Sequence, residues 1–296
     1  MRKLMVLVML AAFLVAGASV ANAAGNQVYY VALGDSLAAG CASGDYQGSF
    51  DHFSGCGGRG YDDQVAESLH SSIPSLKLVN LACGGETTES FISEPRADCY
   101  SRKAPGIPQL DDAVAFLEAH QGRIAFITIT IGANDVFDAC FDPEAGGLDA
   151  GCVADVLPGI RSNLTHILAT IQDAAPGVPV VGTTYYNPLL GLWVLVENGD
   201  QLAHANADAF EVLNEGLAST YAEAGAAVAD VAGAFDIENF TDTVNTKDFG
   251  EIPVNVANAC AWTYFCGRRP SGPFNVHPTT AGYGVIASAV EAALDF

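Results

Sequence analysis

Short apolar, β-branched runs alternate along this chain with longer segments in which apolar residues recur at helical spacing. The apolar runs predict strands at residues 28–33, 76–82, 124–131, 178–184 and 226–231. The helical spacing predicts helices at about 61–70, 108–120, 153–174, 201–224 and 279–294. Because strand and helix alternate five times, the pattern predicts an α/β protein, a three-layer α/β/α sandwich with a five-stranded parallel sheet.

Polar or glycine-rich turns follow the first three of these strands. Gly34-Asp35-Ser36-Leu37 follows the first strand, Gly84-Gly85-Glu86-Thr87 the second, and Gly132-Ala133-Asn134-Asp135 the third. Since ligands of parallel α/β sheets bind outside the carboxyl ends of the strands, we expect these turns to meet at one site. A serine in such a turn is either a nucleophile or the N-cap of the next helix.

A histidine near the end of the chain is the candidate base for this serine. His277 precedes the last helical segment, and Pro278 suits the first turn of a helix. A serine nucleophile needs a base within hydrogen-bond reach, and its oxyanion needs preorganised N–H donors. We therefore expect Ser36 and His277 to be catalytic, and the oxyanion hole to consist of the N–H groups of Ser36 and Gly85 and the side-chain amide of Asn134.

These turns resemble the sequence blocks of the GDSL, or SGNH, hydrolases, a family named after its Ser, Gly, Asn and His residues. Gly34-Asp35-Ser36-Leu37 matches the first block, Gly85-Glu86-Thr87 the second, and Gly132-Ala133-Asn134-Asp135 the third. The second block has Gly84 where serine is common in the family. The resemblance implies a flavodoxin-like strand order and a secreted serine carboxylesterase or lipase. We expect no cofactor and no metal ion.

The sequence departs from the family at the group that orients His277. The family usually has Asp three residues before the histidine, and this chain has Phe274 there and Asn275 next to it. Some secreted relatives use a main-chain carbonyl instead of the acid. By this resemblance we expect a Ser36–His277 dyad in which Nδ1–H donates to the backbone carbonyl of Phe274 or Asn275. The alternative is a distant carboxylate, such as Asp236 or Asp248.

The N-terminus has the pattern of a secretory signal peptide. Two basic residues precede an apolar stretch from Leu4 to Ala16, which Ala21-Asn22-Ala23 follows. We expect residues 1–24 to be removed on export, and residues 25–296 to form a single, monomeric, extracellular domain. The stretch is too short to span a bilayer comfortably, and no second one of comparable apolarity exists.

The chain is strongly acidic. Loss of Arg2 and Lys3 with the leader would change the formal net charge from −22 to −24. This charge disfavours nucleic acid and anionic membranes as partners. It is compatible with neutral ester substrates, such as lipids or acylated polysaccharides.

Eight cysteines in an exported chain predict disulfide bonds rather than zinc ligands. Proximity in sequence favours Cys140–Cys152 and Cys260–Cys266. Secreted members of the family link a cysteine after the first strand to one just before the oxyanion glycine. That resemblance implies Cys56–Cys83 and leaves Cys41–Cys99.

Irregular segments are expected after the strands at 38–60, 137–151, 185–199 and 236–273, where functional loops gather. The apolar segment 185–196 either packs on the core as a helix or lines a pocket for an acyl chain. Two other functions stay open at this point. One is an acyltransferase that uses the same acyl-enzyme, and the other is a non-catalytic binding protein on the same scaffold.

Overall fold

A five-stranded parallel sheet forms the centre of the protein, seen in a computed structural model that describes residues 27–41, 56, 59–93, 106–267 and 275–294. Its strands are β1 (Val28–Gly34), β2 (Leu76–Asn80), β3 (Ile124–Thr130), β6 (Val180–Thr183) and β7 (Ala227–Ala229). They lie in the order β2-β1-β3-β6-β7, and each neighbouring pair is parallel. This is the flavodoxin-like order, so the predicted sheet is confirmed. The expected signal peptide, residues 1–24, lies outside the described residues.

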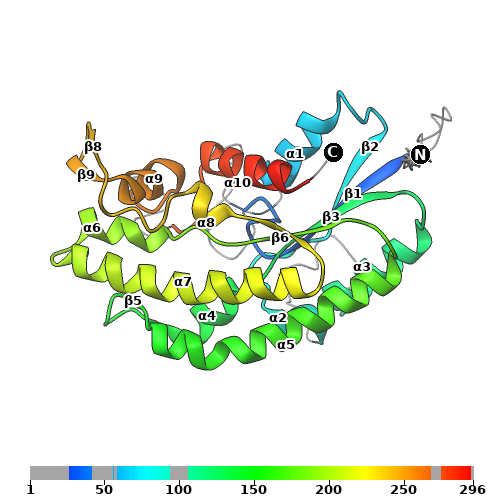
Figure 1. The fold of residues 1–296 in the computed structure, drawn as a ribbon, viewed down its shortest axis with the longest axis horizontal. Helices are drawn as coiled ribbons and strands as arrows, with labels where there is room; N and C mark the ends of the chain where they lie inside the picture. The colour runs from blue at the N-terminus through cyan, green and yellow to red at the C-terminus, as the bar shows by residue number, and fades with distance from the viewer. Residues whose placement is uncertain (1–26, 42–55, 57–58, 94–105, 268–274, 295–296) are drawn as a thin grey trace, which may run out of the picture.

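Helices cover both faces of the sheet (Figure 1). On one face lie α1 (Tyr61–Leu69) and α10 (Thr280–Ala293), and on the other lie α3 (Gln109–Ala119), α5 (Ala150–Ala174) and α7 (Gly199–Glu223). These are the five helices that the spacing of apolar residues predicts. The three-layer α/β/α architecture is therefore confirmed.

The two central strands are buried on both faces because helices cover both sides of the sheet. From Tyr30 to Gly34, and from Phe126 to Thr130, every residue is buried. This explains why the strands read as apolar runs rather than as alternating patterns. The polar groups among them are paired: the hydroxyls of Tyr30 and Thr128 share a 2.9 Å hydrogen bond, as do those of Tyr61 and Thr130.

Glycine is required where β1 ends. Gly34 has a φ of +122°, and a Cβ there would overlap the backbone carbonyl of Thr130 on the neighbouring strand. Gly132, just beyond β3, has a φ of +121°. Side chains other than hydrogen are disfavoured at such φ values. The chain can therefore turn sharply at both strand ends and place the residues that follow at the same edge of the sheet.

Several short elements lie between the predicted ones, most of them in segments expected to be irregular. They are α2 (Thr88–Ile92), α4 (Ala133–Cys140), β4 (Phe141–Asp142), β5 (Gly147–Leu148), the 3-10 helix η2 (Pro188–Gly191), α6 (Leu192–Leu195), α8 (Val231–Ala234), β8 (Thr243–Thr246), β9 (Gly250–Pro253) and α9 (Val254–Trp262). The expectation of irregular structure at 137–151, 185–199 and 236–273 is thus wrong in part. Such elements contain too few turns for a periodic pattern, and tertiary packing stabilises them.

The disulfide bonds correct part of the sequence-based prediction. Cys140 is bonded to Cys152 and Cys260 to Cys266, as expected, but Cys41 is bonded to Cys56. The pairings Cys56–Cys83 and Cys41–Cys99 are therefore wrong. Gly60 packs against Gly40, which brings the two ends of the β1–α1 connection together. Cys41 and Cys56 can then bridge within that connection, and Cys83 takes a different disulfide partner.

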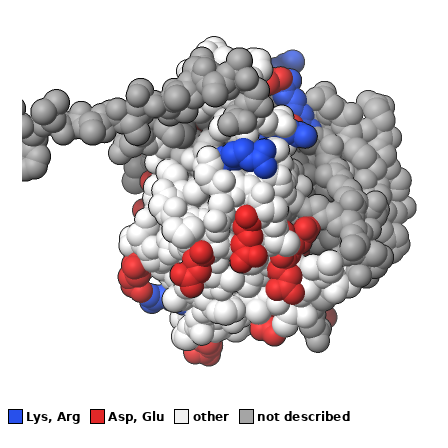
Figure 2. All heavy atoms as spheres, turned by 90° about the vertical axis from the view of Figure 1, so that its right-hand side faces the viewer, with Lys and Arg blue, Asp and Glu red and all other residues white. Residues whose placement is uncertain are grey.

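The surface reflects the acidic composition of the chain. Figure 2 shows one face on which Asp and Glu side chains are spread over the lower half, while most of the Lys and Arg atoms in view lie in the upper part. Among the helices of the described residues, none has both the length and the apolar composition needed to cross a membrane.

Candidate active site

Ser36 lies in a tight turn directly after the central strand β1. The N–H of Asp35 donates to the carbonyl of Thr130 (2.9 Å), and the N–H of Leu37 donates to Oδ1 of Asp35 (2.9 Å). The N–H of Ser36 itself has no acceptor within the described ranges. The next helix, α1, begins after Gly60. Ser36 is therefore not an N-cap, and its half-buried side chain lies at the carboxyl edge of the sheet.

Asn134 and Gly85 are brought together from two different strand ends. Asn134 lies in the first turn of α4, after β3, and its Nδ2 donates to the backbone carbonyl of Glu86 (2.9 Å). Gly85 lies in the turn after β2 with a φ of +74°. Its N–H, like that of Ser36, has no acceptor in the part of the chain that the structure describes. The Asn134 amide thus fixes the Gly85 turn from one side.

Two carboxylates, the buried Glu86 and the half-buried Asp135, hold these turns in place. Oε2 of Glu86 accepts a hydrogen bond from Nε2 of Gln109 (3.0 Å), whose side chain also pairs with the N–H and the carbonyl of Gly34. Asp135 accepts hydrogen bonds from the N–H and the hydroxyl of Thr88 at 2.6–3.1 Å. The turns after β1, β2 and β3 are therefore linked to one another by side chains. Burial raises the pKa of Asp135.

His277 lies on the loop before α10, beside a segment that a disulfide constrains. The N–H of Tyr264 donates to the carbonyl of His277 (3.0 Å), and Thr263 forms a β-bridge with Pro278. Cys260 and Cys266 flank this segment, so their disulfide stabilises the surface against which the histidine loop packs. Burial of the imidazole lowers the pKa of His277 to about 4. The ring is therefore neutral at pH 7, as a general base requires.

The group that contacts Nδ1 of His277 is a side chain. Oδ1 of Asn275 lies 2.9 Å from Nδ1 and also accepts the backbone N–H of His277 at 3.0 Å. The expectation of a backbone carbonyl at Asn275 is thus wrong, because the Asn275 side chain folds back over the turn and reaches the ring first. Phe274 lies outside the described residues. Neither Asp236 nor Asp248 is hydrogen-bonded to His277 in the described structure, which removes the distant-carboxylate alternative.

Ser36, Asn134 and His277 line one cavity of about 260 Å³. Most of the remaining wall is apolar or aromatic, and is formed by Leu37, Ala133, Phe137, Tyr185, Tyr186, Pro188, Phe210 and Val276. Asp35 adds a carboxyl group to this wall. Gly85 does not line this cavity. No hydrogen bond joins the Ser36 hydroxyl to the His277 ring within the described residues, and such contacts often tighten only when substrate binds.

Sequence reasoning missed the role of two tyrosines after β6. The hydroxyl of Tyr186 donates to the carbonyl of Val276 (2.7 Å), next to His277, and the hydroxyl of Tyr185 donates to Oδ2 of Asp35 (2.6 Å). Burial raises the pKa of Asp35 to about 7. The only sequence signal was the position of Tyr185-Tyr186 directly after a strand. Within segment 185–196, Leu189 and Leu190 lie in the core, and the first residues line the cavity, so the acyl-chain pocket stays a prediction.

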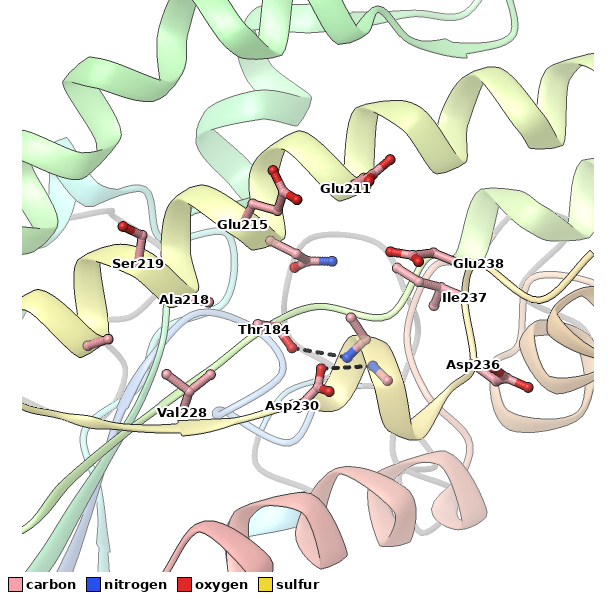
Figure 3. Close-up of a pocket in the computed structure, with 14 residues that line it drawn as sticks. Thr184, Glu211, Glu215, Ala218, Ser219, Val228, Asp230, Asp236, Ile237 and Glu238 are labelled. Carbon is pink, nitrogen blue, oxygen red and sulfur yellow. Dashed lines mark hydrogen bonds between the residues drawn. The ribbon is translucent and has the colours of Figure 1, made fainter.

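A second cavity, of about 720 Å³, lies between α7 and the segment after β7 (Figure 3). Its acidic residues are Glu211, Glu215, Asp230, Asp236 and Glu238. Asp230 accepts the N–H of Gly233 (2.8 Å) as the N-cap of α8, and the Thr184 hydroxyl accepts the N–H of Ala232 (3.0 Å). None of the candidate catalytic residues lines this cavity. The described residues also contain no cluster of three or more His, Cys, Asp and Glu side chains arranged for a metal ion.

The strand order and the polar turns at the carboxyl ends of β1, β2 and β3 define an SGNH-type hydrolase fold. The chain belongs to the GDSL-like lipase/acylhydrolase family, whose model matches residues 32–285. No curated protein sequence matches the chain.

Several solved structures are similar in fold. Phospholipase A1 from Streptomyces albidoflavus aligns with a TM-score of 0.57 at 20% identity, over 90% of this chain and 99% of that one. An extracellular lipase from Streptomyces rimosus aligns with a TM-score of 0.55 at 19% identity, over 89% and 99%. An acetylxylan esterase from Geobacillus stearothermophilus gives a TM-score of 0.51 at 18% identity, over 92% and 96%. At these identities the comparison supports the fold alone.

Proposed function

We propose that this hydrolase is a secreted serine carboxylesterase or lipase that forms an acyl-enzyme on Ser36. One observation carries the proposal: Ser36, Asn134 and His277, from three separate segments of the chain, line the same cavity. A nucleophile, a base and an oxyanion donor are the groups that acyl transfer needs at one place. The family defines a hydrolase or acylhydrolase, and the residue roles are our assignment.

The reaction begins with transfer of the Ser36 hydroxyl proton to Nε2 of His277 while Oγ attacks the ester carbonyl carbon. The tetrahedral intermediate collapses when the bond to the alcohol oxygen breaks, and His277 returns the proton to that oxygen. A water molecule then attacks the acyl-enzyme with His277 again as the base, which releases the acid and regenerates Ser36. The neutral ring of His277 supplies the lone pair that the first step requires.

The negative charge of the intermediate develops on the former carbonyl oxygen. The N–H of Ser36 and the N–H of Gly85, which have no acceptor among the described residues, are the backbone donors, and Nδ2 of Asn134 is the side-chain donor. Because these groups are fixed by the turns after β1, β2 and β3, they need little reorganisation when the charge forms. Such preorganised donors stabilise a transition state more than mobile water does.

The cavity favours a neutral ester with an apolar acyl group. Leu37, Phe137, Phe210 and Val276 are apolar parts of its wall, and Asp35 would repel an anionic acyl group if ionised. Lipid esters and acylated polysaccharides both satisfy this requirement. The disulfide bonds support export to an oxidising compartment.

Labelling with a fluorophosphonate ester tests the proposal directly. The reagent should phosphonylate Ser36 with loss of fluoride, and peptide mass spectrometry should find the adduct on the peptide that contains Ser36. His277→Ala should slow labelling strongly, since the hydroxyl then lacks its base. A wild-type protein that hydrolyses esters without being labelled, or that is labelled elsewhere, would contradict the assignment. Absence of both labelling and hydrolysis would favour a binding protein.

A further inference from the structure

The contact between Asn275 and His277 identifies the tautomer of the imidazole. A backbone N–H can only donate, so the Asn275 atom that lies 3.0 Å from the His277 nitrogen must be the side-chain oxygen. The same oxygen lies 2.9 Å from Nδ1 and has no proton to give. Nδ1 must therefore carry the hydrogen, and Nε2 is left with a free lone pair.

An asparagine beside a catalytic histidine can select the wrong tautomer of the ring, and this arrangement prevents it. An amide can present either its oxygen or its NH₂ group to the ring, and only the oxygen selects the reactive tautomer. In serine proteases, replacement of the triad aspartate by asparagine lowers the rate by about 10⁴ because the wrong tautomer forms. Here the backbone N–H of His277 binds the amide oxygen and so turns it toward the ring.

We infer that Asn275 is the positioning residue of this hydrolase, and that the chain uses a neutral Ser36–His277–Asn275 triad in place of the acidic one. This inference rests on the proposed function of Ser36 and His277. The amide oxygen holds the ring in the orientation and tautomer that leave Nε2 free. It supplies no full negative charge, so the imidazolium that forms during the reaction is stabilised less than beside a carboxylate.

Other contacts already fix the backbone of the histidine loop. Tyr186 binds the carbonyl of Val276, and the N–H of Tyr264 binds the carbonyl of His277. Among the side-chain hydrogen bonds of the described residues, the Asn275 contact is the one made by the ring of His277. Loss of the Asn275 amide should therefore affect the ring more than the loop.

Three variants separate these roles. Asn275→Ala removes both contacts. Asn275→Ser keeps a short acceptor for the backbone N–H but cannot reach Nδ1, so it is the matched control for the loop. Asn275→Asp keeps both acceptors and adds a charge. The measurements are kcat and KM against pH with p-nitrophenyl butyrate, and ¹⁵N NMR of the imidazole in the full chain.

We expect Asn275→Ala and Asn275→Ser to lower kcat by about 10-fold to 100-fold, a fraction of the 10² to 10⁴ that general-base catalysis contributes, with little change in KM. Asn275→Asp should keep a higher kcat than the Ala and Ser variants. The acidic limb of its kcat–pH profile should move upward by about one pH unit or more, since a carboxylate beside a histidine raises the pKa of the histidine by about that amount. The titratable groups that share the cavity with His277 are Asp35, Tyr185 and Tyr186, and they are the same in every variant.

Either of two kinetic results would overturn the inference: Asn275→Ser with the wild-type rate, or Asn275→Asp with an unmoved acidic limb. An NMR spectrum that shows the proton on Nε2 of the wild-type ring would also overturn it. The spectrum does not depend on ester hydrolysis. If Ser36→Ala retained full esterase activity, the proposed function would fail while the tautomer could still be read.

Discussion

The hydroxyl of Tyr185 donates a 2.6 Å hydrogen bond to Oδ2 of Asp35, the residue before the proposed nucleophile. Tyr185 lines the same cavity as Ala133, the residue before Asn134. The loop after β6 is therefore hydrogen-bonded to the turn that holds the nucleophile. The backbone of Tyr185 is in turn fixed by Asn214 of α7, which binds its N–H (2.7 Å) and its carbonyl (2.9 Å).

Tyr185→Phe should lower kcat about 10-fold or more and destabilise the fold by about 1–3 kcal/mol, because the buried carboxyl group of Asp35 loses its hydrogen bond. Tyr221→Phe is the matched control. Tyr221 is also fully buried, but its hydroxyl has no partner in the described structure. Esterase kinetics and thermal unfolding of both variants check the prediction. Equal effects of the two substitutions would show that Tyr185 acts only through packing.

Ser36→Ala and His277→Ala should each reduce ester hydrolysis by several orders of magnitude while the protein stays folded. Residual catalysis by the oxyanion donors and by binding is the reason why activity need not reach zero. The measurement is kcat with a p-nitrophenyl ester, with circular dichroism as the control for folding. More than about a tenth of the wild-type rate in either variant would remove that residue from the mechanism.

Asn134→Ala should lower kcat on the order of 100-fold or more, since loss of one oxyanion donor has an effect of this size in other hydrolases. KM should change much less. Asn163→Ala is a suitable control, because Nδ2 of Asn163 also donates to a neighbouring residue, the hydroxyl of Thr88 (3.1 Å), but lies outside the cavity. A comparable loss in both variants would indicate that the Asn134 amide matters only for the structure of the turn.

Stability should fall between pH 6.5 and 8. Burial raises the pKa of Asp62 to about 8 and that of Asp35 to about 7, from 3.8 in both cases. The folded state then binds more protons than the unfolded state, so this stabilisation is complete below pH 3.8 and is lost as the pH rises through the folded pKa. One such group changes the free energy of unfolding by about 1–2 kcal/mol over this range.

His277 acts in the opposite direction at lower pH. Its pKa is lowered from 6.5 to about 4, so its neutral, half-buried form stabilises the fold above pH 6.5, and this contribution is lost as the pH falls toward 4. Between pH 4 and 6.5 this contribution offsets the loss from one of the two aspartates, so thermal unfolding should show stability falling less steeply with pH there than just above pH 6.5. Asp62→Asn should make stability fall less steeply between pH 6.5 and 8, because the substitution removes a group that titrates there. Asp62 lies outside the catalytic cavity, so the residues that line the cavity are unchanged. An unchanged slope in Asp62→Asn would contradict this account.

Much of the fold follows from local patterns. The strands around Tyr30 and Phe126 are buried on both faces, so their residues are apolar on both faces. In the sequence they are therefore visible as continuous apolar runs. Gly34 and Gly132 mark the strand ends because only glycine fits there. Ser36, Asn134 and His277 could be selected as candidates because the carboxyl ends of parallel strands meet at one edge.

Contacts between distant segments were decided only by the tertiary structure. The Cys41–Cys56 bond depends on the close approach of Gly40 and Gly60. The hydrogen bond from Tyr185 to Asp35 joins residues that are 150 positions apart in the sequence. The hydrogen-bond partner of the His277 ring is the clearest example of a contact that the sequence alone did not predict. Asn275 is only two residues away, yet the resemblance to the family implied a backbone carbonyl, whereas the side chain of Asn275 meets the ring. That choice depends on the path of the loop, which Tyr186 and Tyr264 fix through hydrogen bonds from elsewhere in the fold.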